Sequence, residues 1–70
     1  MAYIAVVKKT PETVVYIASG SYENINHAYY AGISIRSRVY AGKAWINLIE
    51  VNKNGNLRRV DLDAMEGMEQ

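Results

Sequence analysis

The chain contains no cysteine, and this absence excludes disulfide bonds and thiolate metal sites as sources of stability. Its single histidine, His27, cannot form a histidine cluster around a metal ion. A chain of 70 residues makes one domain at most, and it buries only about 60% of the surface that the unfolded form exposes. Because a core of this size rarely supplies more than about 3–5 kcal/mol, we expect self-association to add stability.

Long apolar runs are also missing. No run approaches the length of about 18 residues that suggests a membrane span, and Met1 leads directly into a strand-like pattern rather than into a signal peptide. We therefore expect a cytoplasmic protein, which includes the host cytoplasm if the chain comes from a virus or a mobile element.

Groups that carry catalysis are scarce, because the sequence has no Ser-His-Asp set and no glycine-rich phosphate loop. His27 and Glu23 are four residues apart and suit a general base with its orienting carboxylate, but a solvent-facing pair on a helix is the more common explanation. Asp61 and Asp63 fall on one face of a strand and suit Mg²⁺, although such a pair is more commonly the solvated side of an edge strand. We predict a protein without enzymatic activity, cofactor or metal site.

Charge is unevenly distributed along the chain. Residues 1–60 carry eight Lys and Arg against three acids, a balance of +5, whereas residues 61–70 carry four acids and no base. We predict one domain over residues 1–63 and an acidic C-terminal tail over residues 64–70.

Residues 44–62 predict a β-hairpin. Two runs with strand-like side chains flank Asn54-Gly55, which is the preferred pair for a two-residue type I′ turn because both turn positions need a positive φ. A turn centred on this pair places Glu50 opposite Arg59, where the two form an ion pair.

A second hairpin and a helix are predicted before this segment. Residues 2–8 and 13–18 are strand-like and flank a proline-containing turn, which favours an antiparallel pair. Ser21 is the expected N-cap of a helix over about residues 22–31, and Gly32 is the expected residue just past its end.

Residues 33–40 alternate apolar with polar side chains, and this period of two predicts a half-buried third strand. A helix that continued through them would hold Gly32 in its interior at a cost of about 1 kcal/mol.

These elements predict an α+β fold: a single antiparallel sheet of four to five strands with one helix packed on one face, in the order β-β-α-β-β-β or β-β-α-β-β. One helix covers only one face, and the strands carry apolar side chains on both. A large exposed apolar patch usually marks an interface, so we predict a homodimer.

Aromatic and arginine side chains supply the candidate binding surface. Six Tyr and one Trp with no Phe is a composition of amphipathic aromatics, which are enriched where proteins bind other proteins. The four arginines occur in two pairs: Arg36 and Arg38 are two residues apart, and Arg58 and Arg59 are neighbours. The candidate partner-binding residues are Tyr3, Tyr16, Tyr30, Arg36, Arg38, Tyr40, Trp45, Arg58 and Arg59.

We therefore predict a small protein-binding module. The element order, the small size and the basic body are similar to those of small phage inhibitors such as some anti-CRISPR proteins and antitoxins. That similarity implies an inhibitor that covers the surface of a host defence protein, and it assigns no site residue.

Two alternatives remain open. In a nucleic-acid-binding module, Arg36 and Arg38 would follow the phosphates while Tyr40 stacks on a base, with Arg58 and Arg59 adding charge. In the other alternative, the same side chains would sequester a nucleotide between subunits.

Overall fold

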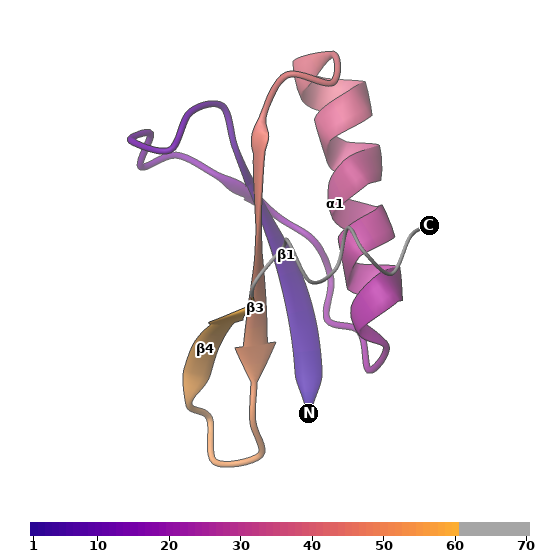
Figure 1. Ribbon diagram of the computed structural model, residues 1–70, viewed down its shortest axis with the longest axis vertical. Helices are drawn as coiled ribbons and strands as arrows, with labels where there is room; N and C mark the ends of the chain where they lie inside the picture. Colours follow the sequence, from indigo (N-terminus) through magenta and orange to yellow (C-terminus); the bar gives the residue numbers. More distant parts are fainter. Residues whose placement is uncertain (61–70) are drawn as a thin grey trace.

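The protein forms two layers, a four-stranded antiparallel sheet and one helix that lies across a single face of it (Figure 1). The computed structural model describes residues 1–60. The elements are β1 (Ala2–Lys8), β2 (Ile17–Ala18), α1 (Ile25–Tyr40), β3 (Trp45–Val51) and β4 (Leu57–Val60), and the strands lie in the order β2-β1-β3-β4. This architecture confirms the predicted α+β class with the shorter of the two element orders. The predictions for residues 61–70, which include the acidic tail and the aspartate pair, lie outside the described residues.

Strand β1 lies inside the sheet because both of its faces are apolar. Ala5 and Val7 are fully buried on the helix side, where Ala5 pairs with the equally buried Leu48 of β3. Ile4 and Val6 point to the opposite side and stay half-buried. The alternation predicted from the sequence is confirmed along this strand.

Strand β2 is shorter than predicted. Of residues 13–18, only Ile17–Ala18 pair with β1, and the preceding residues belong to a loop that begins after Lys8. That loop leaves Val14 and Val15 largely exposed, at 86% and 70%. The branched side chains that predicted a strand are therefore on the surface.

Helix α1 begins at a different cap from the one predicted. The side chain of Asn24, not that of Ser21, accepts hydrogen bonds from the backbone N–H groups of Asn26 at 2.8 Å and His27 at 3.3 Å. An asparagine in this position satisfies N–H groups that have no partner within the first turn of a helix. Glu23 precedes the helix, so the predicted helical pair of Glu23 with His27 is wrong.

The predicted third strand over residues 33–40 is also wrong, because these residues form the second half of α1. Gly32 lies in the middle of the helix rather than at its end. A Cβ atom there would lie 2.9 Å from the Cβ of Ala5 and 3.1 Å from the Cγ2 of Ile46, so the close approach of helix and sheet requires glycine. The residues that α1 buries recur at helical spacing: Ala28, Tyr29, Gly32 and Ile35.

The hairpin of β3 and β4 is present, but its loop has three residues rather than two. The N–H of Asn52 donates to the carbonyl oxygen of Asn56 at 3.0 Å, and the Asn52 side chain accepts from the N–H groups of Asn54 and Asn56. Within the loop only Gly55 has a positive φ, of 83°, whereas a type I′ turn needs a positive φ at both central residues.

The extra loop residue shifts the hairpin register by one position. Glu50 lies opposite Arg58 and Ile49 opposite Arg59, which corrects the predicted pairing of Glu50 with Arg59. Arg58 donates from Nη2 to Oε2 of the nearly buried Glu50 at 2.6 Å, and this hydrogen bond and the carboxylate charge raise the pKa of Arg58 above its usual value. Because a one-residue shift exchanges the two faces, Arg59 points away from the helix side.

We expect Glu50 to couple energetically to Arg58 and not to Arg59. The measurement is a double-mutant cycle of Glu50→Gln with Arg58→Gln, read as free energies of unfolding in urea, beside a second cycle with Arg59→Gln. Only the first cycle removes a charge-assisted hydrogen bond, so only the first should show non-additivity. A larger coupling energy in the second cycle would contradict the observed register and support the two-residue turn.

Helix α1, the helix of residues 1–60, is not long and apolar enough to cross a membrane.

Candidate functional site

One face of the sheet has no layer of helix or strand over it in the described part of the chain (Figure 1). The side chains of β3 alternate: Ile46, Leu48 and Glu50 are buried on the helix side, and the residues between them point to the uncovered side. The strand register adds their neighbours from β1 and β4. We call this surface the open face, and it consists of Ala2, Ile4, Val6, Lys8, Trp45, Asn47, Ile49, Val51, Leu57 and Arg59.

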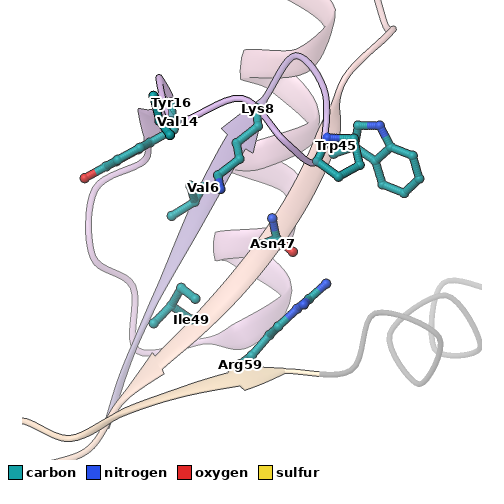
Figure 2. A pocket seen from close by; sticks show the side chains of 9 residues that line it. Val6, Lys8, Val14, Tyr16, Trp45, Asn47, Ile49 and Arg59 are labelled. Atoms are coloured by element: carbon teal, nitrogen blue, oxygen red, sulfur yellow. The ribbon is translucent and has the colours of Figure 1, made fainter.

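The open face contains a hollow of about 620 Å³ (Figure 2). Val6, Asn47 and Ile49 lie along its floor, whereas Tyr16 and Trp45 stand on opposite sides of the two central strands. Tyr16 comes from the loop between β1 and β2, which bends over this side of the sheet. A volume of this size is within the range of clefts that accept small molecules or the side chains of a partner.

The walls of the hollow are aromatic and exposed. Trp45 is 58% exposed and Tyr16 is 57% exposed, and Leu57 at 70% extends the apolar surface beyond the hollow. Isolated apolar side chains on a surface need no explanation, whereas a contiguous group of them around a concave site is typical of interaction surfaces.

The charges of the hollow have one sign. Lys8 and Arg59 line it, and none of its described lining residues is acidic. Lys8 and Arg59 come from opposite ends of the floor in Figure 2. An occupant of the hollow therefore meets two cations with an apolar surface between them.

Three of the nine residues predicted to bind a partner lie around the hollow: Tyr16, Trp45 and Arg59. Tyr3 and Arg58 point to the other face of the sheet. There Tyr3 packs against the core, and Arg58 pairs with Glu50.

The other four predicted residues lie on α1. Tyr30 is 54% exposed, Arg38 is exposed with its Nε donating to the carbonyl oxygen of Ser34 at 3.4 Å, and Tyr40 packs against the core. The Nε of Arg36 is buried, and it has no hydrogen-bond partner among residues 1–60. The strand predicted over residues 33–40 would point Arg36 and Arg38 to the same side, and this is wrong because residues two apart on a helix do not face the same way.

Six residues that line the hollow were not predicted as binding residues: Val6, Lys8, Pro11, Val14, Asn47 and Ile49. The period-two pattern of the two central strands was the available signal for those that lie in strands. Pro11 and Val14 belong to the loop, whose path over the sheet has no local sequence signal.

No protein-family model, no curated protein and no solved structure matches this chain. Among residues 1–60 there is no group of three or more His, Asp or Glu placed to hold a metal ion.

Proposed function

We propose that the protein is a binding module that docks on another protein through its open face. The observation that carries the proposal is the pair of exposed aromatic rings, Trp45 and Tyr16, on either side of a hollow with an aliphatic floor. Rings of this kind supply much of the energy of protein interfaces, because they bury a large area and order few bonds. The open face is on the side of the sheet opposite α1, so an occupant there does not displace the core between α1 and the sheet.

A module of this kind acts by covering a surface of its partner. The size of the chain and its basic body fit a phage-type inhibitor of a host defence protein that works in the cytoplasm. No chemical step is needed for such an action.

A second copy of the chain is a competing occupant of the open face, and it would give the homodimer expected from the sequence. In a two-fold dimer through this face, Lys8 and Arg59 of both copies would enter one interface that has no acidic lining residue in the described part of either chain. Like charges that meet in an interface oppose association, which favours a foreign partner.

Nucleic acid is the other competing occupant. The four arginines predicted to bind nucleic acid lie on three different surfaces. Arg59 lies on the open face, Arg58 lies beside Glu50, and Arg36 and Arg38 lie on α1. A chain of phosphates would need a continuous basic path, and nucleotide sequestration would need these cations to converge.

The test is affinity capture from a lysate of the host cells, with and without nuclease, followed by binding measurements with the captured protein. Wild type is compared with Trp45→Ser and with Tyr30→Ser, a matched control because Tyr30 is a similarly exposed aromatic on α1. We expect nuclease-resistant capture by wild type and the control, and an affinity about tenfold lower or worse for Trp45→Ser.

Other results would contradict the proposal. Capture that nuclease abolishes would favour nucleic acid, and capture that depends on Tyr30 rather than Trp45 would move the site to α1. Light scattering on the same samples measures the molar mass and so detects a homodimer. A dimer that dissociates in the Trp45→Ser variant would assign the open face to self-association.

A further inference from the structure

We infer that the partner segment that fills the hollow is both acidic and apolar: its apolar side chains enter between Tyr16 and Trp45, and its carboxylates pair with Lys8 and Arg59. This inference rests on the proposed function and names the chemistry of the partner.

The two cations of the hollow lie far apart along the sheet. Lys8 pairs with Trp45 on β3, and Arg59 pairs with Ile49, four positions further along the same strand. With about 3.3 Å per residue along a strand and about 4.8 Å between strands, their Cα atoms lie roughly 16 Å apart across β3. Two carboxylates at separated positions of a partner segment would each pair with one of these cations.

Covering these cations costs free energy unless the occupant supplies negative charge. Among residues 1–60 the lining of the hollow supplies no carboxylate, so with these residues alone a neutral or basic occupant would remove Lys8 and Arg59 from water without a counter-charge. An acidic occupant replaces the lost hydration with charge-assisted hydrogen bonds. The described lining of a second copy would instead bring two more cations.

The surface between the two cations is mainly apolar. Val6 and Ile49 lie there, both half-buried and both aliphatic, and Trp45 and Tyr16 flank them. Apolar side chains of a partner would bury this surface and so add binding free energy, whereas the phosphates of a nucleic acid have no apolar surface to bury against it. The combination of an apolar centre with cationic ends therefore favours a peptide with acidic and apolar residues over nucleic acid.

The test is a selection of phage-displayed random linear peptides on the immobilised full-length protein. On wild type we expect enrichment of Asp and Glu together with large apolar residues. The charge-reversed variant Lys8→Glu/Arg59→Glu should enrich basic peptides instead. The matched control Arg38→Glu/Lys53→Glu has the same change in net charge away from the hollow and should retain the acidic pool.

One synthetic peptide from the wild-type pool then gives affinities by fluorescence anisotropy. We expect charge reversal at Lys8 and Arg59 to weaken its binding by about tenfold or more, the control to change it by less than about twofold, and added salt to weaken it.

A pool without acidic bias, a pool that charge reversal leaves unchanged, or no enrichment at all would overturn the inference. So would binding of a poly-uridine RNA that the same charge reversal abolishes, since it would assign the cations to phosphate. The proposed function fails separately, because its failure shows as partner capture that does not depend on Trp45.

Discussion

Gly32→Val is expected to leave little or no stable folded protein. A side chain at this position begins with a Cβ that lies 2.9 Å from the Cβ of Ala5 and 3.1 Å from the Cγ2 of Ile46. The Cβ of Ala5 is attached directly to the backbone of β1 and cannot rotate away, so α1 must move off the sheet. Such overpacking typically costs about 1–3 kcal/mol and sometimes more, which is most of the roughly 3–5 kcal/mol that a core of this size supplies.

The measurement is urea denaturation followed by circular dichroism, with Gly20→Ala as the matched control. Nothing lies within 4 Å of a Cβ at Gly20, and we expect its free energy of unfolding to change by less than about 0.5 kcal/mol. Gly32→Ala should also destabilise, even though alanine is favoured in a helix by about 1 kcal/mol. An unchanged midpoint for Gly32→Val would contradict the packing of α1 on β1 and β3.

Leu48→Ala is expected to lower the free energy of unfolding by about 2–5 kcal/mol, because Leu48 is fully buried between β3 and α1 and its loss leaves a cavity. The matched control is its neighbour Ile49, which is half-buried on the open face. Ile49→Ala should cost clearly less, about 1 kcal/mol, since its side chain keeps part of its contact with water in the folded state. Unfolding in urea measures both.

The two substitutions should also differ in their effect on the affinity for the selected peptide. Ile49→Ala should weaken the selected peptide, because it removes part of the floor of the hollow, while folded Leu48→Ala protein should bind normally. Equal losses of stability at the two positions would contradict the open face as described, since they would mean that Ile49 is covered in solution, for example by a second copy of the chain.

The sequence predicted the fold class and the inner strands well, because strand periodicity is local and strong there. It failed at residues 33–40, where an alternating pattern competes with helical spacing and only tertiary packing decides. Gly32 was interpreted as the end of a helix from its low propensity. The physical reason for this glycine is the distance between helix and sheet, which depends on Ala5 and Ile46 at remote positions.

The hairpin register failed for a different reason. The run from Asn52 to Asn56 is compatible with a two-residue turn and with a three-residue loop that ends at Gly55. The Asn52 side chain favours the longer loop through its two hydrogen bonds to backbone N–H groups. This one-residue difference decides which arginine reaches the open face.

The candidate site was predicted in part. Tyr16 and Trp45 were chosen because tyrosine and tryptophan tolerate partial exposure, and the structure places both at the hollow. Lys8 was missed because a lysine at a strand end has no distinguishing pattern. Arg36 and Arg38 were chosen because a strand was expected where the helix continues.

The alternation of β3 also bears on how such a protein can evolve. Its even-numbered residues hold the helix against the sheet, and its odd-numbered residues face outward. Mutations in the first set mainly change fold stability, whereas mutations in the second set mainly change the surface that we propose as the binding site. In the proposed binding module, successive changes at Trp45, Asn47 and Ile49 would exchange one target for another at a smaller cost in stability than changes at the buried Ile46 and Leu48.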